Sequence, residues 1–138
     1  MGYYQAGHAA IILVDSSSGE CRYFDFGRYH APFGHGRVRS ALTDSELQIQ
    51  NQAVFNESNT AIANLPEILE ELQGKTAFHG EGMLYAAQTA INYDSALKKA
   101  LHMQKTNPHQ YGPFVKGGTN CSRFVYGVIL AGNPRLMV

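Results

Sequence analysis

Two residues far apart in the chain have the side chains of a nucleophile and its base. Cys121 lies where a glycine-rich segment, GGTN, meets an apolar stretch with helical periodicity. The thiolate is the reactive form of cysteine, and a helix N-terminus and a neighbouring histidine both favour it. His8 comes directly before a short apolar stretch that has the composition of a strand. Because a strand holds an imidazole rigidly, the pair could carry out nucleophilic attack on a carbonyl group.

The region around His8 is predicted to form a β-hairpin. Residues 7–14 (GHAAIILV) are a short apolar stretch with β-branched residues, and residues 21–27 (CRYFDFG) alternate between two faces. The sequence DSSSGE between them has the composition of a turn. We therefore expect two antiparallel strands joined by a tight loop.

The register of this hairpin identifies a third polar residue, Asp25. If Asp15 and Glu20 face each other across a four-residue loop, Ala10 lies opposite Asp25. His8 is then diagonal to Asp25 on the same face, within reach of a hydrogen bond between carboxylate and imidazole. A register slip of one residue would turn Asp25 away from His8.

Further strands are expected along the first two thirds of the chain. Glycine and proline indicate a long loop over residues 28–41 that ends in a short strand at 37–41. Weak alternation predicts one or two short strands within 46–55. Two glycines in 75–91 predict a strand, a bend and a second strand.

Three helices are expected from periodicity and capping residues. The first covers residues 64–74 with Asn64 as its cap, and the second covers 94–105 with Asp94 as its cap. The third begins at Cys121. Its apolar positions recur with the spacing of one buried helical face, namely Cys121, Phe124, Val125, Val128 and Ile129.

The composition predicts a single domain over residues 1–138. Its 44% hydrophobic residues can fill one core, and eleven basic residues balance eleven acidic ones. Neither nucleic acid nor an anionic membrane is therefore favoured as a partner. No apolar stretch approaches the roughly 20 residues that cross a bilayer, and the N-terminus lacks a signal-peptide pattern. A cytoplasmic location is expected unless the chain is a domain of an exported protein.

The sequence indicates neither a metal nor a cofactor. Its six histidines include no pair at the spacing of a helical metal site. The motifs of serine hydrolases, zinc peptidases, dinucleotide-binding proteins and phosphate loops do not occur. Cys21 and Cys121 are too few and too far apart for a disulfide framework, so both are expected to be free thiols. Cys21 lies in a predicted strand, where packing is its expected role.

The segments GHAAIILVD, YFDFG and NCSRFV together resemble the NlpC-type papain-like superfamily. The resemblance is to its circularly permuted branch, which includes lecithin:retinol acyltransferase-like proteins, because the histidine strand precedes the cysteine helix. It covers residues 5–27 and 111–130. It implies an α+β, papain-like domain in which a small antiparallel sheet packs against a C-terminal cysteine-bearing helix and one or two further helices.

Position by position, the resemblance implies a triad of Cys121 as nucleophile, His8 as base and Asp25 as the third member. This third position is often histidine in the family, and an aspartate there would hold the imidazolium form more strongly. The expected substrate-binding residues are Tyr111, Arg28 and Asn120.

A basic loop over residues 28–39 could bind a carboxylate or a phosphate of the substrate. The alternative is a solvated loop whose arginines pair with distant acids. His79, near the predicted bend, is expected to be a turn residue rather than a substrate contact. The loop's basic side chains are Arg28, His30, His35, Arg37 and Arg39.

The triad residues also have structural interpretations. Cys121 could pack as a small hydrophobic residue, and His8 could be an ordinary strand-end histidine. Asp25 could bond a backbone group or an arginine such as Arg28. If the histidine and cysteine segments did not occur in the order found in the superfamily, packing would be the better interpretation of Cys121.

The sequence therefore favours a cysteine hydrolase that acts through an acyl-cysteine intermediate. The expected partner is a small peptide, amide or acyl substrate, with a cell-wall peptide as one possibility. One alternative is an acyltransferase, or a lipid or thioester hydrolase, of the permuted branch. Two further alternatives are a catalytically silent ligand-binding domain and an interaction module of a longer protein. The oligomeric state is left open.

Overall fold

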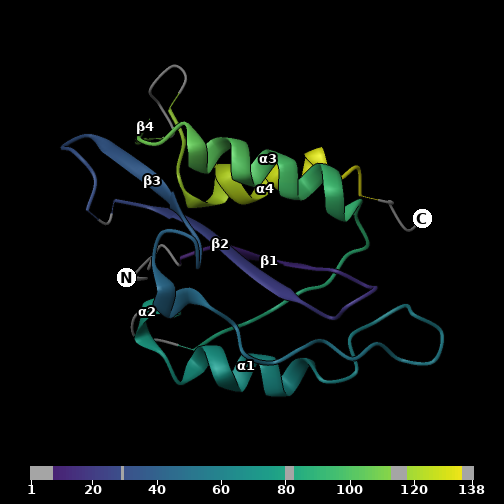
Figure 1. The fold of residues 1–138 in the computed structure, drawn as a ribbon. Coiled ribbons are helices and arrows are strands. Elements are labelled where there is room, and N and C mark those ends of the chain that lie inside the picture. The colour runs from purple at the N-terminus through teal and green to yellow at the C-terminus, as the bar shows by residue number, and fades with distance from the viewer. Residues whose placement is uncertain (1–7, 29, 80–82, 113–117, 135–138) are drawn as a thin grey trace, which may run out of the picture.

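A computed structural model describes residues 8–28, 30–79, 83–112 and 118–134. It shows a small antiparallel sheet between two layers of helices, which confirms the α+β class (Figure 1). The strands, in the order in which they pair, are β1 (Ala10–Val14), β2 (Cys21–Gly27), β3 (His35–Arg39) and β4 (His109–Gln110). The helices are α1 (Leu65–Gln73), α2 (Thr76–His79), α3 (Tyr93–Lys105) and α4 (Cys121–Ala131), with a 3₁₀ turn at Ser45–Leu47.

The β1–β2 hairpin has the register that its turn predicts, with Ala10 opposite Asp25. The Asp15 N–H donates to the Glu20 carbonyl oxygen at 3.0 Å and closes the loop. Gly19 adopts φ +81°, and a Cβ there would lie 2.5 Å from the Ala53 carbonyl oxygen. This turn position therefore requires glycine, which fixes the loop and, with it, the register.

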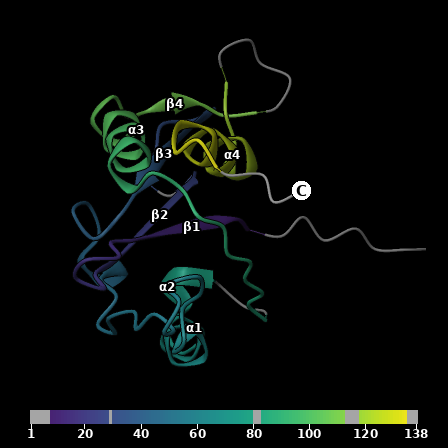
Figure 2. The same ribbon diagram turned by 90° about the vertical axis from the view of Figure 1, so that its right-hand side faces the viewer.

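Each face of the sheet is covered by its own layer of helices, and Figure 2 shows α1 and α2 on one side and α3 and α4 on the other. The core beneath α3 and α4 is formed by Leu13, Phe24, Phe26, Val38, Ala96, Ala100, Phe124 and Val128. The core beneath α1 and α2 is formed by Cys21, Tyr23, Leu47, Ile49, Ala53, Ile68, Leu72 and Phe78. Because both faces of the sheet are covered, every residue of β2 except Arg22 is buried.

The alternation of side chains along β2 decides which residues face which layer. Phe24 and Phe26 point toward α3 and α4, whereas Tyr23 belongs to the core on the α1 and α2 side. Because successive side chains of a strand point to opposite faces, Asp25 shares the face of Tyr23. The Asp25 side chain and helix α4 therefore lie on opposite faces of the sheet.

Two predictions about the middle of the chain are wrong. No strand forms within 46–55, where Phe55 makes only an isolated bridge with Ile62. A side chain replaces the strand partner there, because the Glu71 carboxylate accepts the N–H groups of residues 50 and 51 at 2.6 and 2.9 Å. In place of the first strand expected within 75–91, the chain forms α2, which buries Phe78 against the Tyr23 ring at a centroid distance of 4.8 Å.

The expected helices form, although two of their caps differ from the prediction. The Asn64 side chain does not cap α1; its amide group bonds the backbone of residues 52 and 54 instead. Helix α3 is capped by Asn92, whose side-chain oxygen accepts the Ser95 N–H at 2.9 Å, so the helix starts before Asp94. In the described part of the chain, no helix has the length and apolar character needed to span a bilayer.

Candidate active site

The side chains of His8 and Asp25 are in contact, as the hairpin register predicts. His8 Nε2 lies 3.0 Å from Asp25 Oδ2, and the Asp25 side chain is fully buried, whereas that of His8 is 24% exposed. His8 precedes β1, which is an edge strand of the sheet. The imidazole therefore lies at a corner of the sheet. Its hydrogen bond links the buried Asp25 carboxylate to a side chain that is partly exposed to solvent.

Asp25 is also held by Arg39, its direct neighbour across the β2–β3 pairing. Arg39 Nε donates to Asp25 Oδ1 at 2.8 Å, and Arg39 Nη2 donates to Oδ2 at 2.6 Å. Two parallel bonds of this kind fix both the position and the plane of a carboxylate. The arginine that pairs with Asp25 is thus Arg39 rather than Arg28.

A tyrosine completes this buried cluster and joins it to α2. The Tyr23 hydroxyl lies 2.8 Å from Asp25 Oδ2 and 2.9 Å from the Phe78 carbonyl oxygen, so one proton serves two acceptors. Arg39 Nη2 also donates to the Ala77 carbonyl oxygen at 3.1 Å. The cluster therefore ties β2 and β3 to the end of α2.

Burial by itself would raise the pKa of Asp25, because the charged form loses its hydration. The hydrogen bonds from Arg39 and His8, together with the positive charge of Arg39, outweigh that effect and lower the pKa of Asp25 below its usual value. Asp25 is consequently an anion at neutral pH.

Cys121 is a free, half-buried cysteine at the first position of α4. Asn120 caps this helix, because its side-chain oxygen accepts the Arg123 N–H at 2.8 Å. Backbone N–H groups of a first helical turn have no partner within their own helix and point along its axis. The thiol is thus placed at the positive end of a helix dipole, beside donors that could stabilise an oxyanion.

Cys121 and His8 belong to the same end of the sheet. Phe124, one turn after Cys121, stacks on Phe26 with ring centroids 6.4 Å apart. Phe26 precedes the last residue of β2, and continuation of the β1–β2 register places His8 opposite that last residue, Gly27. Figure 1 shows β1 and α4 starting on the same side of the molecule.

Of the two contacts that a triad requires, the structure shows the one between His8 and Asp25. Among the described residues, no hydrogen bond joins the Cys121 sulfur to the His8 ring, and α4 covers the sheet face opposite Asp25. The complete triad is therefore still a prediction.

Arg28 and Tyr111, two expected substrate-binding residues, contact each other near the start of α4. The Arg28 guanidinium lies 4.6 Å from the centroid of the Tyr111 ring, a cation–π arrangement. Tyr111 forms a bridge with Thr119, two residues before Cys121, and its ring stacks on Phe26 at 6.1 Å. An exposed cation is thus held over an aromatic ring close to the candidate nucleophile.

A comparison with protein-family models matches residues 1–137 to the TseH-like type VI secretion system effectors. The chain belongs to this family. The TseH-like family is of the papain-like, NlpC/P60 type, which agrees with the superfamily indicated by the sequence and supports a cysteine hydrolase. Neither a curated protein nor a solved structure matches the chain significantly.

In this TseH-like protein, the basic loop is not a continuous cationic surface. Arg37 pairs with Asp44 through two hydrogen bonds of 2.9 Å each, and Arg39 is the buried partner of Asp25. Two of the three arginines therefore serve structural ion pairs, and Arg28 is the one directed to an aromatic ring near α4. The His79 side chain lies outside the described residues.

The sequence places Arg39 only in the basic loop and gives Tyr23 no role, whereas in the structure both contact Asp25. A carboxylate predicted to lie inside a sheet must have a cation or several donors, so the burial of Asp25 was the available signal. Tyr23 lies two positions before Asp25 on the same strand face, where a hydroxyl can reach the carboxylate.

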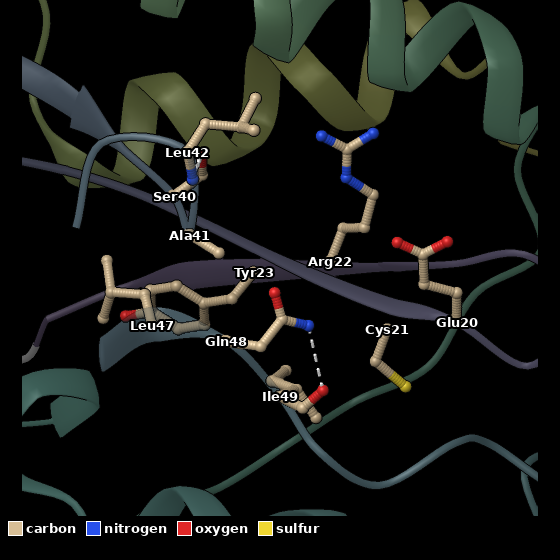
Figure 3. A pocket seen from close by; sticks show the side chains of 10 residues that line it. All are labelled: Glu20, Cys21, Arg22, Tyr23, Ser40, Ala41, Leu42, Leu47, Gln48 and Ile49. Atoms are coloured by element: carbon tan, nitrogen blue, oxygen red, sulfur yellow. Dashed lines mark hydrogen bonds between the residues drawn. The ribbon is translucent and has the colours of Figure 1, made fainter. Parts of the chain in front are cut away.

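The TseH-like chain also has a small cavity that borders the buried cluster at Tyr23. It has a volume of about 110 Å³ and opens beside the first residues of β2, at the opposite end from Gly27 (Figure 3). Figure 3 shows Arg22 and Glu20 on one side of it, and the Gln48 side chain bonded to the Ile49 carbonyl oxygen. Within the described ranges, no three His, Cys, Asp or Glu side chains are grouped as metal ligands would be.

Proposed function

We propose that the protein is a cysteine amidase or peptidase with Cys121 as nucleophile, His8 as base and Asp25 as the residue that orients His8. The observation that carries this proposal is the hydrogen bond between His8 and Asp25, formed in the register that the hairpin dictates, at the end of the sheet where α4 begins. Membership of the TseH-like family supports the same chemistry.

In this proposal each ring nitrogen of His8 has its own role. Nε2 contacts Asp25, and Nδ1 takes the proton of the Cys121 thiol. The thiolate attacks the substrate carbonyl, and N–H groups of the first turn of α4 stabilise the oxyanion. The Nδ1 proton then passes to the leaving amine, and water, deprotonated by the same nitrogen, releases the acyl group from sulfur.

The position of His8 reconciles this mechanism with the separation of Asp25 from α4 by the sheet. A residue inside β1 could face only one layer, because strand side chains point to alternating faces. His8 lies before β1, at the edge of the sheet, where an imidazole can contact Asp25 with one nitrogen and turn the other toward the start of α4.

A peptide with a free carboxylate is the substrate that best fits the surroundings of Cys121. Arg28, held over the Tyr111 ring, offers a guanidinium that binds carboxylates with two parallel hydrogen bonds. Peptides of the bacterial cell wall have such carboxylates beside their amide bonds. Since the family consists of type VI secretion system effectors, we infer that the protein acts in a cell to which it is delivered.

The order of the functional residues, with histidine and aspartate before cysteine, supports a circularly permuted arrangement within the papain-like superfamily. Such an arrangement leaves both the base and the orienting residue on one hairpin, so their contact depends on a single turn. We propose that this chain belongs to the permuted branch.

The alkylation rate of Cys121 tests the proposal, with Cys21 as a control in the same molecule. Burial raises the pKa of the Cys21 thiol, so this cysteine should react slowly with iodoacetamide at pH 7. Cys121 should react about threefold faster than glutathione if His8 acts as its base, because the base takes the thiol proton. His8→Ala should abolish this advantage. Peptide mapping by mass spectrometry measures both rates.

A catalytically silent domain is the second candidate, because Asp25 already has structural partners in Arg39 and Tyr23. If Cys121 reacts no faster than glutathione and His8→Ala leaves its rate unchanged, this second candidate replaces the enzyme. If Cys121 is reactive, release of peptides from purified cell walls, with Cys121→Ser as control, separates an amidase from an acyltransferase or an ester hydrolase.

A further inference from the structure

Arg39 lies directly behind the contact between His8 and Asp25, and the expected triad gives it no role. We propose that Arg39 is a positioning residue of the active site, which fixes the Asp25 carboxylate toward His8 and offsets its negative charge. This inference rests on the proposed function of His8 as the base.

The positioning effect follows from the hydrogen bonds of the Arg39 side chain, which is 7% exposed. Its Nε and Nη2 atoms bind the two oxygens of Asp25 at 2.8 and 2.6 Å, and Nη2 is also anchored to the Ala77 carbonyl oxygen. The carboxylate cannot rotate without breaking one of the two parallel bonds. Oδ2 is therefore held toward His8 Nε2, at 3.0 Å.

The charge of Arg39 affects how easily His8 releases a proton. A carboxylate in contact with an imidazole stabilises the imidazolium form, most strongly where water is excluded. A base that must later protonate the leaving group works best when neither of its forms is strongly preferred. Arg39 offsets the Asp25 charge. The aspartate therefore still accepts the hydrogen bond from His8, but it stabilises the protonated form of His8 less strongly.

The other groups around Asp25 do not supply this charge. From β2, the Tyr23 hydroxyl donates a hydrogen bond to Asp25, and from α2 the carbonyl oxygens of residues 77 and 78 accept from Arg39 and Tyr23. The Lys75 ammonium is directed to the Phe78 ring, 5.8 Å from its centroid. Apart from His8 itself, Arg39 is the cationic side chain among the described residues that contacts the Asp25 carboxylate.

The pairing with Arg39 lets an aspartate stand where the NlpC-type superfamily often has histidine. A neutral imidazole can be buried with hydrogen bonds alone, whereas a fully buried carboxylate needs a cation or several hydrogen-bond donors, and Arg39 supplies both. Asp25 and Arg39 face each other across adjacent strands, so they can act as one unit in place of a histidine.

NMR titration of the His8 ring tests this inference without requiring catalysis. In Arg39→Gln, the titration midpoint of His8 should rise by about one pH unit or more, because the Asp25 charge is no longer offset. In Arg39→Lys the rise should be smaller, because an ammonium keeps the charge but cannot span both oxygens. The control is Arg37→Gln on the same strand. It breaks the ion pair with Asp44 and should shift the His8 midpoint much less than Arg39→Gln does, because the carboxylate left unpaired is not the one bonded to His8.

An unchanged His8 midpoint in a folded Arg39→Gln variant would overturn the inference, and so would an equal shift in Arg37→Gln. If Arg39→Gln does not fold, the same titration is made on Arg39→Lys, and an unchanged His8 midpoint in that variant overturns the inference. Alkylation of Cys121 separates the two proposals. If Cys121 is reactive but the His8 midpoint does not change when Arg39 is replaced, only the role of Arg39 is refuted. An unreactive Cys121 refutes the active site itself.

Discussion

Replacement of Asp25 by asparagine should destabilise the fold much more than the same change at Asp44. Each aspartate accepts two hydrogen bonds from an arginine of β3, at 2.8 and 2.6 Å from Arg39 and at 2.9 Å twice from Arg37. The pairs differ in burial. The Arg39 and Asp25 side chains are 7% and 0% exposed, whereas those of Arg37 and Asp44 are 16% and 13% exposed. The two substitutions therefore compare the same arginine–carboxylate pair in two environments, and Asp25→Asn also disturbs the hydrogen bonds from Tyr23 and His8.

The expected magnitudes follow from what each arginine loses. Asp25→Asn leaves the Arg39 guanidinium buried without its anion, which costs about 3–5 kcal/mol of unfolding free energy. At Asp44 water reaches the pair, so Arg37 can be rehydrated and the loss should be about 1 kcal/mol. Because asparagine has nearly the size of aspartate, neither change creates a cavity.

Urea unfolding at pH 7 measures the comparison. With a slope of about 2 kcal/mol per molar urea, a difference of about 2 kcal/mol separates the two midpoints by roughly 1 M. Equal losses in the two variants, or a loss below about 1 kcal/mol for Asp25→Asn, would show that the buried pair is no stronger than the exposed one. In that case the charge argument for Arg39 would also fail.

Two further substitutions test the elements that support the site. Asn120→Ala should lower the unfolding free energy by about 1 kcal/mol and slow the alkylation of Cys121, because the first turn of α4 loses its cap, whereas Asn120→Ser should preserve both. Burial favours a higher pKa for Glu71, but backbone hydrogen bonds from Gln50 and Asn51 outweigh it and lower the pKa below 4.5. Glu71 therefore stabilises the fold above pH 4.5, and this contribution disappears as the pH falls through its lowered value. Glu71→Gln should cost about 1–2 kcal/mol at pH 7 and reduce the loss of stability between pH 5 and 3, measured by urea unfolding, and an unchanged pH dependence would contradict this role.

The sequence was sufficient to predict the contact between His8 and Asp25 because that contact depends on local information. A tight turn fixes the register of its own hairpin, and Gly19 permits the positive φ and the close approach to Ala53 that this turn needs. The start of α4 is likewise encoded locally, since Asn120 caps the helix and apolar residues recur along one face of it.

Contacts between distant segments were not predictable in the same way. Residues 46–55 have the composition of a strand, but their backbone bonds the Glu71 side chain, which lies on a helix some 20 residues later. Nor did periodicity reveal which helix covers which face of the sheet. Apolar residues occur on both faces of β2, so the strand shows that two layers exist without assigning α4 to either.

The buried cluster around Asp25 has a sufficient structural explanation in the described contacts with Arg39 and Tyr23, which join two strands to α2. These contacts would hold the fold together with or without His8, so they do not by themselves support catalysis. The His8 contact is different, because it lies before the strand, at a corner of the sheet, and its side chain is partly exposed. A bond from a buried anion to a partly exposed imidazole adds little to stability, but it orients a base. The functional interpretation therefore depends on His8, and the alkylation rate of Cys121 with and without this histidine is the measurement that decides it.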